Sequence, residues 1–367
     1  MNSVVVCAAV ACALLGAPSG RIAFVAGTEQ EDQCVAVLDA ATGEITRVGP
    51  GSRDGAPVWS PDGRWLAFQT SGPDGLAVCV VRADGSERRL LTHARGWNHA
   101  PRWSPDGKRL AYASDADMGI RQQILVYDLE QNTETAWGGE GALALRPVWL
   151  PTTDLMQALD PESQSDMAAE LLPLKEEAER EGALLAVGLA GGESKLTSEI
   201  VLITPTRCVP MLPLLVKDSF RFAEWFVEPD RKGRQIAYES NDGGDRELFV
   251  IGRKGITNVS NHRAADWNPV WSEDGQWLAF ESFRGGRRGV HRVLVGTANV
   301  TPVAVRPNAD CWAPSWSPDG EWIAHVSDET GAPQLFATPP QGGDSVQLTR
   351  GPGFALAPAW QPKVKKD

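Results

Sequence analysis

Long hydrophobic runs, histidine or cysteine clusters and an excess of basic residues are all missing from this chain. The apolar stretch Val4–Ala17 is too short for a transmembrane helix, so we expect no membrane span. A net charge of −12 argues against a nucleic-acid binder, whose phosphate contacts need clustered lysine and arginine. Six cysteines without a C-x-x-C pair predict neither a zinc site nor a dense disulfide framework.

Catalytic signatures are missing as well. The sequence has no G-x-S-x-G, no H-E-x-x-H and no phosphate-binding glycine loop, and its five histidines have no metal-ligand spacing. We therefore expect a protein that is not an enzyme and holds no resident cofactor. A divalent metal in a central channel is an alternative that no residue pattern supports.

What the chain does have is a repeated phrase, Ala56-Pro57-Val58-Trp59-Ser60-Pro61-Asp62-Gly63. It returns around Trp103, Trp271 and Trp316, and weaker copies surround Trp149, Trp225 and Trp360. These seven anchor tryptophans lie 44, 46, 76, 46, 45 and 44 residues apart. A period of about 40 to 50 residues is typical of a β-propeller with one four-stranded blade per repeat. We predict an all-β, closed seven-bladed propeller; a six-bladed ring with an irregular fourth repeat is the alternative.

Each copy predicts a hairpin. A short strand ends at the tryptophan, Ser-Pro-Asp-Gly makes the turn, and a β-rich segment such as Trp65–Phe68 follows. The turn aspartates are Asp62, Asp106, Asp274 and Asp319, and we expect them to bond to local backbone rather than to form a carboxylate site. The anchor tryptophans are expected to pack between neighbouring blades.

Proline, Trp, Ser-Pro-Asp-Gly, an Ile/Leu-Ala-Phe/Tyr strand and a closing Leu-Thr resemble the WD40-like PD40 repeat of TolB-type propellers. The resemblance covers residues from about 20 to 362 and implies a non-enzymatic scaffold of the periplasm or cell envelope that binds a protein or a small ligand. Two alternatives have the ligand site at the same mouth: an enzyme like the oligogalacturonate lyases, and a propeller associated with a peptidase. TolB itself carries an extra N-terminal α/β domain, whereas only about 20 residues precede the first predicted strand here.

The two ends of the chain carry separate predictions. Residues 1–19 are expected to be a signal peptide, residues 20–362 the propeller and residues 363–367 a tail, which indicates a periplasmic or secreted protein. Cys12 could serve as a lipoprotein anchor, although the residues before it match that signal weakly. The segment Ala357–Pro362 is expected to supply the innermost strand of the first blade and so to close the ring.

The misfit spacing of 76 residues indicates an insertion at residues 152–183. Ser163–Arg180 has a helical composition, and Pro173 is expected to begin a second helical segment. The insertion falls between the first and second strands of its blade, opposite the mouth. If Leu155–Leu159 is instead the second strand, the insertion projects from the mouth.

A propeller binds ligands at its channel mouth, which is built by the loops before each first strand and between the second and third strands. Counting back from each anchor gives a ring of aromatic, acidic, amide and basic residues suited to a sugar, a peptide or side chains of a partner protein. We predict binding by Asp54, Trp97, His99, Arg146, Arg221, Asp266, Trp267, Asn268, Asp310 and Trp312. Trp267 and Trp312 are alternatively plain packing residues.

The loop from Phe283 to Arg288 adds three arginines to this end of the ring, at positions 284, 287 and 288. They could grip a carboxylate or phosphate, or the loop could simply be solvated. We expect a monomer that binds a protein, peptide or oligosaccharide and no nucleic acid.

Overall fold

The computed structural model describes residues 16–51, 53–72, 75–92, 96–115, 122–139, 142–151, 168–192, 195–211, 224–241, 244–252, 255–297 and 299–363. Most of the predicted signal peptide, Cys12, Arg221 and residues 364–367 lie outside these ranges. Within them the chain is almost entirely β-structure, with one α-helix, α2 (Ala168–Glu181), and a 3-10 turn, η1 (Gln30–Asp32).

Four kinds of strand recur in the repeat. The first strands, which end at or near an anchor residue, are β4 (Val58–Trp59), β8 (Gly96–Trp103), β12 (Ala144–Trp149), β16 (Glu224–Pro229), β20 (Asp266–Trp271), β24 (Cys311–Trp316) and β28 (Phe354–Trp360). The second strands are β1 (Arg21–Gly27), β5 (Trp65–Gly72), β9 (Arg109–Ser114), β13 (Leu184–Gly192), β17 (Ile236–Ser240), β21 (Trp277–Ser282) and β25 (Ile323–Ser327). The third strands are β2 (Cys34–Asp39), β6 (Gly75–Arg82), β10 (Gln123–Asp128), β14 (Lys195–Ile203), β18 (Glu247–Gly252), β22 (Gly289–Leu294) and β26 (Gln334–Thr338). The fourth strands are β3 (Ile45–Arg47), β7 (Arg89–Leu90), β11 (Thr133–Trp137), β15 (Cys208–Pro210), β19 (Gly255–Asn258), β23 (Val300–Ala304) and β27 (Val346–Gln347).

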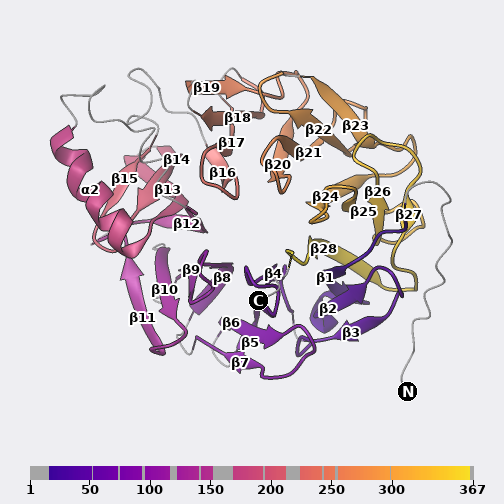
Figure 1. Cartoon of the computed structure of the whole chain (residues 1–367), viewed down its shortest axis with the longest axis horizontal. Helices are drawn as coiled ribbons and strands as arrows, with labels where there is room; N and C mark the ends of the chain where they lie inside the picture. The colour runs from indigo at the N-terminus through magenta and orange to yellow at the C-terminus, as the bar shows by residue number, and fades with distance from the viewer. Residues whose placement is uncertain are drawn as a thin grey trace.

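These strands form six sheets of propeller type. Five sheets have four antiparallel strands, and one has eight because β6 and β8 pair in parallel through Gly75–Gly96 and Leu76–Trp97. Figure 1 shows the sheets following one another around a central axis, with the first strands innermost. Strand β28, from the far end of the chain, pairs with β1 in the pattern that the sequence predicts, although it begins three residues earlier than expected.

The anchor tryptophans join neighbouring sheets, as the sequence predicts. Five of them donate a hydrogen bond of 2.9–3.2 Å from indole Nε1 to a backbone carbonyl in the first strand of the preceding repeat: Trp59, Trp103, Trp149, Trp271 and Trp316. Trp360 Nε1 has no such partner among the described residues. The acceptor is always the residue just before that strand's own anchor position: Trp103 donates to Val58, and Trp316 donates to Val270. Each of the five donating indoles therefore contributes apolar area and a directional bond to the same joint.

Trp225 is not the anchor of its sheet, which corrects the prediction from sequence. Pro229 pairs with Ile236 in the same register that places Trp271 opposite Leu278. The indole of Trp271 also donates to Glu228, the residue before Pro229. The anchor position is therefore occupied by Pro229, which has no indole to donate to the preceding sheet.

The Ser-Pro-Asp-Gly turns are closed by local hydrogen bonds. In the first copy Ser60 Oγ donates to Asp62 Oδ1 at 2.5 Å, Arg64 N donates to the same oxygen at 3.0 Å, and Trp65 N donates to Ser60 Oγ at 2.9 Å. The same bonds recur around Asp106, Asp274 and Asp319. These aspartates are engaged within their own turns and leave the mouth end of the ring to other residues.

Helix α2 lies in the connection between β12 and β13. Pro173 lies inside this single helix and does not begin a second one, contrary to expectation. The helix is fixed to its sheet by buried Glu177, which accepts hydrogen bonds from Thr204 Oγ1 at 2.7 Å and from Thr206 N at 3.0 Å. Leu155–Leu159, the alternative second strand, lies outside the described residues.

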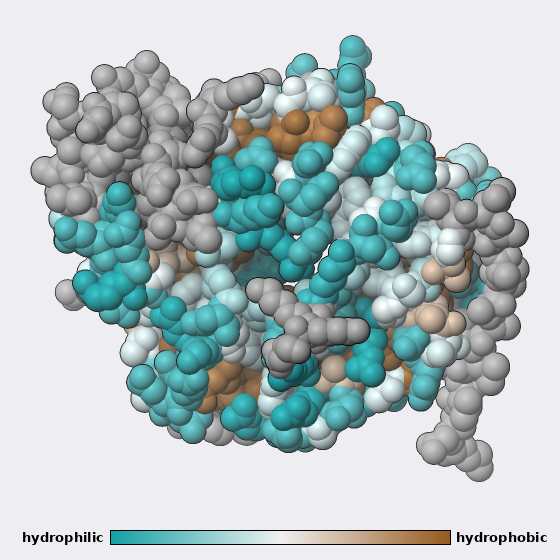
Figure 2. Space-filling view, in the orientation of Figure 1, coloured by the Kyte–Doolittle hydropathy of each residue, from teal (hydrophilic) through white to brown (hydrophobic). Residues whose placement is uncertain are grey.

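The face seen in Figure 2 is mostly hydrophilic around the centre of the ring. The apolar side chains are used between the sheets, where clusters such as Phe24, Trp322, Leu335 and Trp360 are buried. No helix in the described ranges is both long enough and apolar enough to cross a bilayer.

Candidate binding site

A left-handed residue three positions before the anchor shapes the start of most first strands. Its φ lies between 50° and 55° at Ala100, Arg146, Asn268, Ala313 and Ala357. At each of these points the pairing with the second strand shifts register, as in a β-bulge. The bulge releases the N–H of this residue from its own ladder and leaves it available to the neighbouring sheet.

Two buried glutamates use these released N–H groups. Glu239 at the end of β17 accepts a bond of 2.6 Å from Asn268 N, and Glu281 at the end of β21 accepts one of 3.0 Å from Ala313 N. Both side chains are 1% exposed. Each glutamate thus bonds to the first strand of the following sheet, at the predicted mouth end.

Each glutamate also holds an arginine from the loop that follows its strand. Arg246 Nε donates to Glu239 Oε2 at 2.9 Å, and Arg288 Nε donates to Glu281 Oε2 at 2.5 Å. Burial raises the pKa of Glu239, and the nearby Arg246 charge lowers it in part. In both pairs a buried carboxylate fixes the orientation of a rigid guanidinium group.

Three aromatic side chains lie around Arg288: Trp267, Phe283 and Trp312. We call these four residues the aromatic shelf. The Arg288 Cζ atom is 5.6 Å from the Trp267 ring centroid and 5.3 Å from that of Trp312. The Trp267 and Phe283 rings are 5.1 Å apart. Phe283 is 48% exposed, which is unusual for so large an apolar side chain. The shelf therefore presents apolar rings around an oriented cation.

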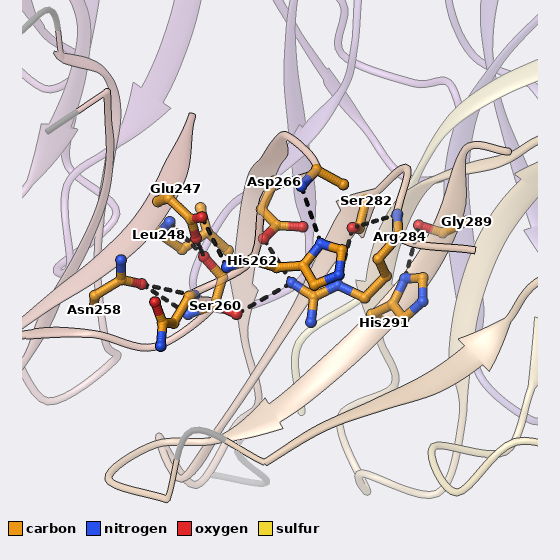
Figure 3. A network of polar contacts seen from close by, with 12 residues as sticks. Glu247, Leu248, Asn258, Ser260, His262, Asp266, Ser282, Arg284, Gly289 and His291 are labelled. Atoms are coloured by element: carbon orange, nitrogen blue, oxygen red, sulfur yellow. Dashed lines mark hydrogen bonds and ion pairs between the residues drawn. The ribbon is translucent and has the colours of Figure 1, made fainter. Parts of the chain in front are cut away.

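A buried polar network fixes the loop that carries the shelf (Figure 3). Arg284 reaches back from this loop to Asp266 Oδ2 at 2.6 Å, to Ser260 O at 3.3 Å and to Ser282 Oγ at 3.0 Å. Glu247 extends the network by accepting from Ser260 Oγ and from His262 N. The loop between β21 and β22 is therefore tied to β20 and to Ser260 after β19, and through Ser260 to Glu247 of β18.

Burial controls the ionisation of this network. It raises the pKa of Asp266 and Glu247, and the Arg284 charge partly offsets the rise. It also lowers the pKa of His291 to about 4, with a further contribution from Arg284. His291 is therefore neutral at physiological pH, and Arg284 is the cation that the two carboxylates share.

The three loop arginines are all paired with acids. Arg284 bonds to Asp266 and Arg288 bonds to Glu281, while Arg287 Nη1 lies 3.5 Å from Asp310 Oδ1. The loop is neither simply solvated nor a bare cluster of three cations. Of the three, Arg287 and Arg288 are the exposed ones, at 51% and 32%, whereas Arg284 is 14% exposed.

The predicted binding residues separate into three groups. Trp267, Asn268 and Trp312 are brought together at the shelf, with Asp310 at its edge. Asp54 and Asp266 are completely buried. Asp54 accepts from Val35 N at 3.0 Å and from Thr70 Oγ1 at 2.7 Å, so it serves the fold rather than the surface.

The remaining predicted residues lie on other first strands. Trp97 is 62% exposed, and its N–H donates to Asp115. His99 is half-buried; burial lowers its pKa, and so does the neighbouring charge of exposed Arg146. Arg221 lies outside the described residues. Sequence reasoning missed Glu239 and Glu281, although the recurrence of Ala-Tyr/Phe-Glu-Ser with an arginine seven residues later could have revealed them.

Farther along the first strands an ion pair joins β8 and β16. Arg102 Nη2 of β8 lies 3.6 Å from Glu228 Oε2 of β16, and burial raises the pKa of Glu228. The sheet containing β12 stands between these two strands and contacts both of them. The pair therefore links the two first strands that flank β12.

Replacing Arg102 by Met is expected to lower the free energy of unfolding at pH 7 by about 1 kcal/mol, because it leaves Glu228 without its cation in a partly exposed site. Since the folded pKa of Glu228 is raised, the folded state holds a proton there more readily than the unfolded chain. The free energy of unfolding that Arg102→Met removes should therefore become smaller as the pH falls. The decrease should begin above the raised pKa of Glu228 and continue toward the ordinary glutamate pKa. Urea unfolding at several pH values measures it. The double change with Glu228→Gln should remove the pH dependence, and equal deficits at every pH would contradict the assignment.

The described residues hold no group of three or more His, Cys, Asp or Glu side chains placed to bind a metal ion. His99 is the histidine nearest the predicted mouth ring, and His291 and His325 are buried among the strands.

Comparison with known proteins agrees with this architecture. Residues 15–178 match the PD40 family, described as the TolB β-propeller domain. Over this part of the chain the sequence is therefore similar to the PD40/TolB β-propeller family. The resemblance deduced from the repeat is therefore confirmed.

Individual relatives of this propeller are distant. A TolB homologue of Chlorobium chlorochromatii is 27% identical over 137 residues, which span 36% of this chain and 30% of that protein. The TolB crystal structure from Acinetobacter baumannii superposes with a TM-score of 0.56 at 18% identity, covering 94% of this chain and 67% of that one. The propeller domain of the trilobed protease from Pyrococcus furiosus gives a TM-score of 0.64 at 12% identity, covering 91% and 96%. At these identities the two structures show the shared fold alone.

Proposed function

We propose that this chain is a non-enzymatic propeller scaffold of the cell envelope that binds a protein partner at the mouth end of its ring. The observation that carries the proposal is the aromatic shelf, where Phe283 is 48% exposed beside two tryptophans and an oriented arginine. Aromatic and arginine side chains are the types most enriched at the energetic centres of protein interfaces. The relationship to TolB supports a location in the cell envelope.

A closed ring of seven blades is part of this proposal. The eight-stranded sheet counts as two blades, β4–β7 and β8–β11, that are joined by the short parallel pairing of β6 with β8. Pairing of β28 with β1 supports closure by the two ends of the chain. A closed ring leaves no open sheet edge and gives the loops at the mouth a rigid support.

The shelf is held rigidly, and this favours a role in binding a partner over a role in catalysis. Glu281, Asn268 and Ala313 tie it to two first strands, and Arg284 ties its loop to Asp266 of β20 and to Ser260, which follows β19 of the preceding sheet. Such pre-organisation lowers the entropy that a binding surface loses when a partner docks. The partner contacts expected here are apolar packing on the rings and hydrogen bonds to Arg288.

Selection of random dodecapeptides displayed on phage tests the proposal directly. Peptides that bind the purified protein should lose binding to the Phe283→Ala/Trp312→Ala variant. The same peptides should still bind the Trp65→Ala variant, which loses a tryptophan far from the shelf in sequence. The Trp65 ring centroid lies 4.9 Å from Arg82 Cζ and 5.3 Å from Arg89 Cζ, in a different sheet from the shelf. Thermal unfolding of each variant verifies that it is folded. If every selected peptide binds the double variant as well as the original protein, the mouth is not the binding site.

A further inference from the structure

Resting on the proposed function, we propose that the aromatic shelf recognises an acidic segment of its partner: an Asp or Glu carboxylate binds the exposed edge of Arg288, and an adjoining apolar or aromatic side chain packs on Trp267, Phe283 and Trp312.

Arg288 is held in a fixed orientation with one edge left over. Its Nε and Nη2 both face Glu281 Oε2 at 2.5 Å, and its guanidinium stands between the Trp267 and Trp312 rings. None of the described residues bonds to its remaining nitrogen, Nη1, and the side chain is 32% exposed. A planar guanidinium with a free edge is a geometric match for a carboxylate oxygen.

Two of the three acids that neutralise these arginines are buried. Glu281 is 1% exposed and Asp266 is completely buried, whereas Arg287 and Arg288 are 51% and 32% exposed. Asp310 is the one acid of these pairs that shares the surface, at 37%. A docking ligand therefore meets N–H donors and aromatic faces, with the compensating negative charge lying behind them.

The charge of the whole protein gives this local arrangement its selectivity. A net charge of −12 disfavours acidic ligands over most of the surface. The loop Phe283–Arg288, by contrast, has three arginines and no acid. An acidic segment should accordingly bind here and not elsewhere, and its affinity should fall as salt concentration rises.

Glu281 orders the Arg288 side chain before any ligand binds. A free arginine would lose side-chain freedom on binding a carboxylate, but this one is already ordered by a buried partner and two rings. Asn268 and Ala313 saturate the other oxygen of Glu281, so that carboxylate cannot turn outward to repel the ligand.

The test begins from the peptides selected above. They should be enriched in Asp or Glu next to an aromatic or aliphatic residue. In isothermal titration calorimetry a synthetic peptide should bind the Glu281→Gln/Arg288→Gln variant about tenfold or more weakly, because a charge-assisted hydrogen bond is lost. The paired substitution avoids leaving Glu281 buried without its cation. Changing the peptide acid to its amide should weaken binding to the original protein by a similar factor and add little further loss in the variant.

Arg292→Gln is the matched control, since Arg292 lies on the adjoining strand β22 and stacks on Trp277 at 4.1 Å, outside the shelf. Its peptide affinity should equal that of the original protein. Peptides that need Phe283 yet carry no acid, or that bind the Arg288 variant unchanged, would overturn this inference while leaving the proposed function standing. If trigalacturonate shows Arg288-dependent binding and no peptide does, the ligand is an acidic saccharide and the acidic protein segment is wrong. If every peptide binds the Phe283→Ala/Trp312→Ala variant as well as the original protein, the proposed function itself is wrong.

Discussion

Truncation after Gly353, which removes β28, is expected to abolish the cooperative folded state. This strand pairs with β1 from Ile22–Trp360 to Gly27–Phe354, and Ala359 O accepts the indole bond of Trp59. Removing the buried Trp360 side chain alone should cost about 3–5 kcal/mol. That is a large share of the roughly 5–15 kcal/mol by which a typical protein is stable. Urea unfolding followed by circular dichroism measures the loss.

Two companion experiments make the truncation result specific. Ending the chain after Lys363 should leave the unfolding midpoint unchanged, because β28 and the hydrogen bond from Gln361 to Gly63 remain. A synthetic peptide of residues 354–363 should restore a cooperative transition by adding the missing strand to β1. A chain truncated after Gly353 that unfolds at the original urea concentration would show that β28 does not hold the ring together.

Replacing Glu281 by Ala should have the second-largest effect, on stability and binding together. The carboxylate accepts bonds from Asn268 Nδ2 at 2.7 Å, from Ala313 N at 3.0 Å and from Arg288 at 2.5 Å, and it is 1% exposed. Removing one member of a buried ion pair typically costs about 3–5 kcal/mol. Arg288 would also lose its orientation between the rings, so peptide binding at the shelf should disappear.

Chemical unfolding and hydrogen exchange of residues 283–288 measure these two consequences separately. The exposed Glu321, in a turn of the next sheet, supplies the control: Glu321→Ala should change stability by less than about 0.5 kcal/mol. Glu281→Gln should fall between the two, since an amide oxygen can still accept from Asn268 or Ala313. Equal stability of the Glu281→Ala and Glu321→Ala variants would mean that the buried pair does not anchor the shelf.

The repeat in the sequence predicts the propeller-type sheets well because each local signal coincides with a structural need. Proline and glycine in Ser-Pro-Asp-Gly match the turn, and the anchor tryptophan matches a joint between sheets. The misplaced anchor at Trp225 has a physical cause. Tryptophan occurs at two positions of the repeat, at Trp267 and Trp271 and again at Trp312 and Trp316, and only strand register shows which position Trp225 occupies.

The candidate site was harder to predict because it depends on partners from different sheets. Counting back from the anchors named Trp267, Asn268 and Trp312, which the structure brings close together. The same counting could not show that Asp54 and Asp266 turn inward to bond with Thr70 and Arg284. Glu281 sits on a strand whose pattern looks purely structural, and its role follows from the left-handed turn at Ala313 in the next sheet.

The contact between Arg102 and Glu228 braces the sheet that departs most from the repeat. The ion pair joins β8 to β16 directly, and both strands also contact β12, which starts the sheet that carries helix α2. The innermost strand of that sheet is therefore clamped by its two neighbours, even though Pro229 gives β16 no indole to donate.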